Sequence, residues 1–162
     1  MATIVTKKVL IQAQTVFDVT GLNQEIDEKL INPFILTAQE LHIEPLLGTR
    51  LYDAILNDQY NDLKENFVYQ ALCWYTVLEA IPLLFTRVGN GGLYNNAPEN
   101  AQIVQNNSVS QMKEWASSKA NEYANRLFKE VSYNSGSYPE FRTSQPDEEQ
   151  SSDSQIKFGL LL

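Results

Sequence analysis

Few side chains in this sequence could carry out chemistry. His42 is the only histidine, so a Ser-His-Asp or Cys-His site would have to be built on it. It lies at the predicted end of a helix beside Pro45, among apolar residues, which favours a packed or capping histidine over a catalytic base. Cys73, the only cysteine, falls in the middle of an apolar helical pattern, where a small buried hydrophobe is the usual interpretation.

Three further motifs resemble ligand sites without meeting their requirements. The glycine run from Gly89 to Gly92 follows a predicted helix rather than a strand, and no Lys-Ser or Lys-Thr pair comes after it. It is therefore predicted to be a helix hinge or cap. The polar stretch 57–62 lacks the turn glycine of a calcium loop, and the acids at 147–149, with Asp153, are typical of a solvated tail. We predict that the protein is not an enzyme and has no cofactor or metal site.

The longest predicted helix, over about 62–87, is apolar on almost every side. A helix of this kind is buried on several sides, in a core or between subunits. We expect that so small a domain does not enclose it alone, and that part of its surface meets a neighbouring copy. The interface residues predicted on this helix are Trp74, Tyr75, Leu78 and Glu79.

Glu79 is the one charge inside this apolar pattern. A carboxylate in apolar surroundings needs a partner. The sequence leaves two alternatives open for Glu79: an ion pair within the fold, with Arg50, Arg87 or Arg126, or an ion pair across a subunit boundary.

Composition limits the class of protein. The chain has 162 residues, 43% of them hydrophobic, which fits one folded domain with a hydrophobic core. Its formal net charge of −8 disfavours binding nucleic acid by charge neutralisation, but suits a passage along which DNA slides without sticking. A single cysteine excludes an intrachain disulfide and fits a reducing compartment. The apolar stretch Phe67–Phe85 approaches membrane-span length, but Glu79 and Pro82 within it argue against a span.

The hydrophobic periodicity predicts the elements that must position these residues. Weak alternation over residues 3–19 indicates an extended arm or a short strand. Helical patterns cover about 23–41, 49–57, 62–87 and 108–131, with Pro33 expected to kink or divide the first and with a tight corner at Pro45 and Gly48. The predicted fold is mainly α: a small bundle of about four helices with an extended N-terminal arm and an extended C-terminal tail.

These patterns divide the chain into an arm (1–22), a helical domain (23–132) and a tail (133–162). The tail is rich in Ser, Pro, Gln and acids, so it should be extended on its own. It ends in an apolar stretch, which suggests docking on another surface. The docking residues predicted there are Ile156, Phe158, Leu160, Leu161 and Leu162.

The segment from Ile31 to Tyr52 resembles a signature of small head–tail connector proteins from tailed phages of the crAss-like group and their relatives. The pattern consists of an Ala-Gln pair on a helix, an Ile-x-Pro-Leu-Leu-Gly corner and a Leu-Tyr pair that opens the next helix; here these are Ala38-Gln39, residues 43–48 and Leu51-Tyr52. The later aromatic and apolar helix and the stretch 138–141 are also similar. The resemblance covers about residues 20–141.

The resemblance implies a structural virion protein, assembled in the host bacterial cytoplasm. It would form a ring, dodecameric in these relatives, below the portal protein, where it extends the DNA channel and offers a platform to the next connector or tail ring. Genomic DNA would pass through without sequence-specific binding, and no membrane would be involved. Closed rings use head-to-tail contacts between two different faces. The apolar helix, the tail and the N-terminal arm are candidates for those faces.

An alternative is a generic helical interaction or scaffold domain with no ring role. A DNA-binding regulator is disfavoured, because no predicted helix has the basic face of a recognition helix.

Overall fold

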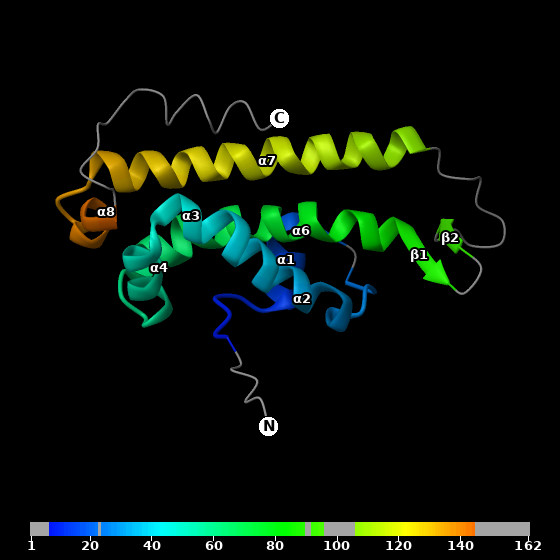
Figure 1. Ribbon diagram of the computed structural model, residues 1–162, viewed down its shortest axis with the longest axis horizontal. Helices are drawn as coiled ribbons and strands as arrows, with labels where there is room; N and C mark the ends of the chain where they lie inside the picture. The colour runs from blue at the N-terminus through cyan, green and yellow to red at the C-terminus, as the bar shows by residue number, and fades with distance from the viewer. Residues whose placement is uncertain (1–6, 23, 90–91, 96–105, 145–162) are drawn as a thin grey trace.

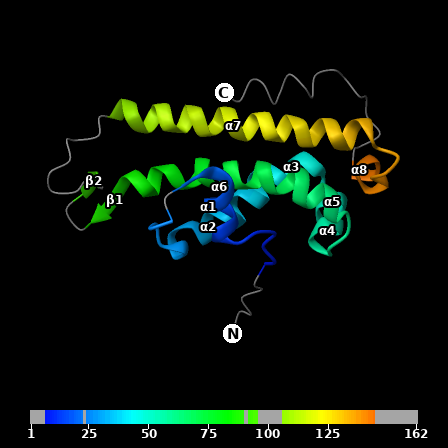
Figure 2. The same cartoon turned by 180° about the vertical axis from the view of Figure 1, so that it is seen from behind.

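The computed structural model describes residues 7–22, 24–89, 92–95 and 106–144. The fold is mainly α, as predicted, and α6 (Tyr69–Phe85) lies at its centre. The long helix α7 (Asn106–Tyr133) runs antiparallel to α6 on one side, and α1 (Ala13–Thr20) and α2 (Glu28–Ala38) pack on its other side (Figures 1 and 2). α6 is therefore sandwiched between two helical layers.

Short elements connect these layers. They are the π-helical turn η1 (Gln39–Ile43), α3 (Glu44–Leu47), α4 (Thr49–Leu56), α5 (Asn61–Leu63) and the π-helical turn η2 (Lys64–Val68), which leads directly into α6. The first predicted helix (23–41) corresponds to α2 and η1, and the second (49–57) to α4. The third (62–87) corresponds to α5, η2 and α6, and the fourth (108–131) to α7.

α2 begins later than the sequence pattern suggested. Asp27 is its N-cap and accepts a hydrogen bond from the backbone N–H of Lys29, while Glu28 places a negative charge in the first turn. Pro33 lies inside this helix and does not divide it, although the ring removes the N–H that would bond the Lys29 carbonyl. The Thr37 hydroxyl donates to the Pro33 carbonyl one turn earlier.

The predicted corner is confirmed. Pro45 lies in the first turn of α3, where a missing N–H costs little. Gly48 has φ +78°, a conformation that favours glycine, and it separates α3 from α4. Leu46 and Leu47 of the corner are buried in the core.

The prediction of an extended N-terminal arm is wrong for residues 13–20, which form α1. Ala13, Val16 and Phe17 lie three and four positions apart and are buried against the core, so this segment belongs to the helical domain. β-branched residues in it mimic a strand pattern. The helix ends at Gly21, whose N–H bonds the Phe17 carbonyl in a left-handed cap. Residues 3–6 of the predicted arm lie outside the described residues.

Gly89 and Gly92, the two glycines of the run that the structure describes, lie in strands and not in a hinge or a helix cap. α6 ends at Phe85, and the chain continues as an antiparallel hairpin of β1 (Thr86–Gly89) and β2 (Gly92–Asn95). Gly89 pairs with Gly92 at the closed end of this ladder. The two residues between them, 90 and 91, lie outside the described residues.

The predicted C-terminal tail is partly helical. α8 (Pro139–Ser144) starts at a proline and packs on α4, and Phe141 within it is buried. The buried phenylalanine explains why this polar stretch is ordered. The rest of the predicted tail, residues 145–162, lies outside the described residues.

The expectation that part of the surface of α6 meets a neighbouring copy stays a prediction, and Leu83 near the end of this helix is 44% exposed. The chain's own helices bury its middle, with seven consecutive residues buried from Ala71 to Val77. Within the described residues, one helix, Asn61–Leu84, is long and apolar enough to cross a membrane by length and composition, and 56% of its apolar 18-residue window is buried inside the fold. Cys73 is fully buried, as predicted.

Candidate interaction surfaces

A hydrogen-bonded junction holds the corner in place. Gln39, in η1, is fully buried, and its amide donates to the Tyr52 hydroxyl in α4 (2.9 Å). The same side chain reaches the N-terminal segment: it accepts from the Leu10 N–H (2.6 Å) and donates to the Lys8 carbonyl (3.2 Å). Gln39 and Tyr52 belong to the Ala-Gln and Leu-Tyr pairs that looked like a signature. Their role here is to join three segments of backbone.

The second cluster contains His42 and Glu79. His42 Nε2 lies 2.7 Å from Glu79 Oε1, and the imidazole stacks on the Tyr75 ring with centroids 4.1 Å apart. Glu79 therefore has a partner within the fold, but the partner is a histidine rather than any of the three arginines predicted. His42 is a packed side chain, as the sequence indicated.

The four interface residues predicted on α6 are in different environments. Trp74 and Tyr75 are buried within the chain: Trp74 packs edge-on against Trp115 of α7 (centroids 4.9 Å apart), and the Tyr75 hydroxyl bonds Asn121 of the same helix. Leu78 and Glu79 are only partly covered. The five docking residues predicted at 156–162 lie outside the described residues. Whether any of these nine residues meets another subunit stays a prediction.

The exposed apolar side chains lie mainly elsewhere. Leu41 in η1 is 61% exposed, and on α7 Met112, Trp115 and Tyr133 are exposed, Tyr133 by 82%. The sequence pattern predicts an apolar stripe of Met112, Trp115, Ala116, Tyr123, Leu127 and Phe128 on this helix. Ala116 and Leu127 are buried as predicted, whereas Met112 and Trp115 are exposed. The other buried residues of the helix are Ala120, Ala124 and Val131, and the four-residue spacing of the three alanines is the signal in the sequence that marks this face.

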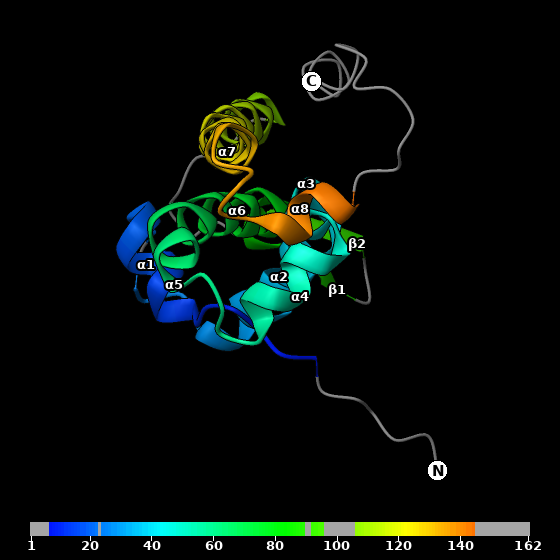
Figure 3. The same cartoon turned by 90° about the vertical axis from the view of Figure 1, so that its left-hand side faces the viewer.

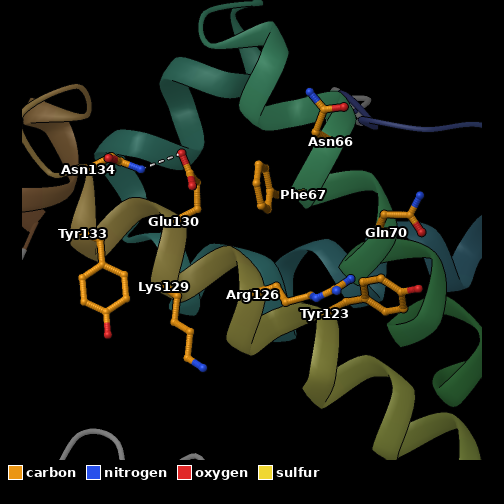
Figure 4. Close-up of a pocket in the computed structure, with 9 residues that line it drawn as sticks. All are labelled: Asn66, Phe67, Gln70, Tyr123, Arg126, Lys129, Glu130, Tyr133 and Asn134. Carbon is orange, nitrogen blue, oxygen red and sulfur yellow. Dashed lines mark hydrogen bonds between the residues drawn. The ribbon is translucent and has the colours of Figure 1, made fainter.

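A groove of about 700 Å³ runs between the start of α6 and the second half of α7 (Figure 4). η2 and α6 contribute Asn66, Phe67 and Gln70 to it. α7 contributes the other wall, with Tyr123, Arg126, Lys129, Glu130, Tyr133 and Asn134. The wall therefore combines aromatic rings with two cationic side chains.

The charges in this groove are not balanced locally. The Arg126 guanidinium lies over the Tyr123 ring, 5.6 Å from its centroid, and within the described part of the chain no salt bridge joins Arg126 or Lys129 to a carboxylate. Glu130, the one acid of the groove, accepts hydrogen bonds from Asn134 and Tyr138 instead. The groove therefore suits an acidic or apolar occupant.

A family model describes residues 43–150 of this chain, about two thirds of it. The chain belongs to DUF6712, a family of unknown function. The comparisons found no curated protein that matches significantly, and no solved structure that does.

The DUF6712 match begins at the last residue of η1, so it includes the corner, α6, α7 and α8. Both walls of the groove and Tyr52 lie inside the DUF6712 region, whereas Gln39 and the N-terminal segment that it binds lie outside. The groove is thus built entirely from the part of the chain that defines the family.

Two observations bear on chemistry in this DUF6712 chain. Burial raises the pKa of the Cys73 thiol to about 12, which keeps it protonated at neutral pH. In residues 7–22, 24–89, 92–95 and 106–144, no three His, Cys, Asp or Glu side chains gather as a metal site would require.

Alkaline pH should unfold the protein. The hydrogen bond from the Tyr60 hydroxyl to Glu140 (2.6 Å), which ties α8 to the α4–α5 loop, raises the pKa of Tyr60 to about 12, and burial raises the pKa of Tyr75 to about 12. Since both values exceed the ordinary 10.0, the stabilisation is complete below pH 10 and is lost as pH rises toward about 12. Circular dichroism should show intact helices at pH 10 and their loss by about pH 12, together with tyrosinate absorbance. Full tyrosine ionisation with the helices intact would contradict this.

Proposed function

We propose that this protein is a structural virion component that forms a ring in the head–tail connector of a tailed bacteriophage, below the portal. The observation that carries the proposal is the junction of Gln39 with Tyr52 and the N-terminal segment. It gives a physical purpose to the residues that resemble the connector signature. Residues that fix a corner of a scaffold are what a structural adaptor needs, whereas a catalytic signature would place reactive groups in a cleft.

The distribution of apolar side chains supports a ring. Head-to-tail contacts require two different adhesive faces on each subunit. Leu41 is exposed on η1, on the α2 side of α6, while Met112, Trp115 and Tyr133 are exposed on α7, which covers the other side. Side chains of this size at two separate places on one small domain favour contacts with two neighbours.

The charge of the chain supports a place on a DNA path. A net charge of −8 repels phosphates, so DNA would move through such a ring without being held. The number of subunits, twelve, and the position below the portal come from the resemblance alone. The second candidate, a generic helical interaction domain, is favoured by the groove, because the groove would suit a peptide of any partner.

The test is the mass of the purified chain in solution, alone and mixed with the portal protein of the same phage. We expect a ring-sized species of many copies, either for the chain alone or on addition of portal. A chain that stays monomeric and does not bind the portal would refute the connector role and favour the generic interaction domain.

A further inference from the structure

We infer that the groove between α6 and α7 binds residues 156–162 of a neighbouring copy of this chain. This inference rests on the proposed ring and names the contact that would link its subunits. It is carried by four features: the composition of the groove, the charge of the linker, the reach of the linker, and the flank of α7 from which the chain departs.

The composition of the groove matches that of the segment. Phe67 and Tyr123 are only partly buried, and Tyr133 is largely exposed, so the groove presents apolar surface of three aromatic rings to solvent. The segment 156–162 supplies Phe158 and three consecutive leucines. A short apolar peptide laid along a groove between helices is a common mode of recognition.

The charges are complementary. Arg126 and Lys129 line the groove beside one acid, Glu130, and no salt bridge joins either cation to a carboxylate within the described residues. The linker 145–155 carries Asp147, Glu148, Glu149 and Asp153, with no lysine or arginine. The segment 156–162 itself holds one cation, Lys157, so the four acids of the linker, and not the segment, are what would meet the two cations beside the groove. Such pairs at a rim steer the encounter and fix its orientation.

The linker is long enough to reach another subunit. α8 ends at Ser144, so 11 residues separate it from Ile156. A chain of that length spans at most about 40 Å when extended, which exceeds the diameter of a helix pair.

The linker leaves the fold from α8, on one side of α7, and this favours binding to the groove of a neighbouring copy over binding to the groove of the same chain. Phe141 of α8 packs edge-on against Phe128 of α7, with ring centroids 6.2 Å apart. Phe128 is two positions from both Arg126 and Glu130, which places Phe128 on the opposite flank of α7 from these two groove residues, although Tyr138, directly before α8, still bonds Glu130. Figure 3 shows α8 on one side of α7 and α5, which precedes the groove wall, toward the other. A C-terminal segment that leaves from one side of the subunit, and a groove on the opposite side that binds it, form the head-to-tail arrangement of a ring.

Photo-cross-linking of the full chain tests this contact. Phe158 would be replaced by p-benzoylphenylalanine, and equal amounts of ¹⁴N- and ¹⁵N-labelled chains would be mixed, assembled with portal and irradiated. We expect cross-links from position 158 to groove peptides in mixed heavy and light pairs. Cross-links only within one isotope label would show that the segment docks on its own chain, and cross-links elsewhere, or none, would exclude the groove. Either result would overturn the inference.

A charge-reversed variant sharpens the test. R126E/K129E should reduce the groove cross-link at least tenfold, whereas K113E, on an exposed site near the other end of α7, should leave it unchanged. Circular dichroism checks that both variants fold. Rings that form on the portal without the cross-link would leave the connector function standing and end this inference. A groove cross-link in chains that never bind the portal would support this inference and count against the connector function.

Discussion

Replacing Gln39 with leucine should lower the free energy of unfolding by about 3 kcal/mol. The side chain is fully buried and makes three hydrogen bonds, to Tyr52, Leu10 and Lys8. Each bond contributes about 1 kcal/mol net, and partners left unsatisfied in partly buried positions add a desolvation penalty. Urea unfolding measures the loss. Hydrogen exchange at the Leu10 amide should accelerate more than exchange in α7, because that amide loses its acceptor.

Tyr52→Phe is the matched control for the Gln39 variant. It removes one of the three hydrogen bonds and keeps the ring, so a loss of about 1 kcal/mol is expected. If Q39L costs no more than Y52F, the junction to the N-terminal segment contributes nothing, and the structural account of the motif is wrong.

Enlarging Ala120 to leucine should have the other large effect, a loss of about 2–3 kcal/mol. Ala120 is fully buried on α7 between Ala116 and Ala124, so these small side chains let α7 approach α6 closely. Three added carbons have no room in that contact and must push the helices apart. Thermal unfolding should shift to lower temperature, and the groove should widen because α6 and α7 form its two walls.

Ser118→Leu is the control for this substitution. Ser118 is exposed on the same helix, two positions away, and the same side chain there should change stability by less than about 0.5 kcal/mol. Equal effects at the two positions would show that the loss at Ala120 comes from helix propensity or solubility rather than packing. That outcome would contradict the close contact of α6 with α7.

Local signals in the sequence were sufficient for the main helices. The apolar repeats over α2, α4, α6 and α7 follow the period of a buried helix, and Pro45 and Gly48 punctuate the chain where the structure turns. Burial of Cys73 and packing of His42 also followed from their apolar surroundings. These features depend on residues close in sequence.

The errors arose where tertiary contacts outweigh local pattern. β-branched residues around Val16 looked like a strand, yet packing of α1 against α6 selects the helix. The composition of residues 139–144 looked unstructured, yet the burial of Phe141 and the bond from Tyr60 to Glu140 order α8. Contacts of this kind join residues up to 80 positions apart, which periodicity does not reveal.

The candidate surfaces were predicted only in outline. The sequence marked α6 as too apolar to stand alone, but it did not show that α1, α2 and α7 cover the middle of the helix and leave Leu78, Glu79 and Leu83 at least partly exposed. The partner of Glu79 was sought among arginines, because a histidine 37 positions earlier carries no local signal. The groove was not predicted at all, since its walls come from α6 and α7, and only their packing brings Phe67 and Arg126 together.

The central claim is that copies of this chain assemble as a ring on a phage portal. Electron microscopy of the portal protein mixed with an excess of the full chain tests it most directly. We expect an added ring of density, coaxial with the portal, whose subunits fit the α6–α7 pair, with a symmetry of twelve if the resemblance holds in detail. Portal particles that gain no density at saturating concentrations of a folded chain would contradict the claim.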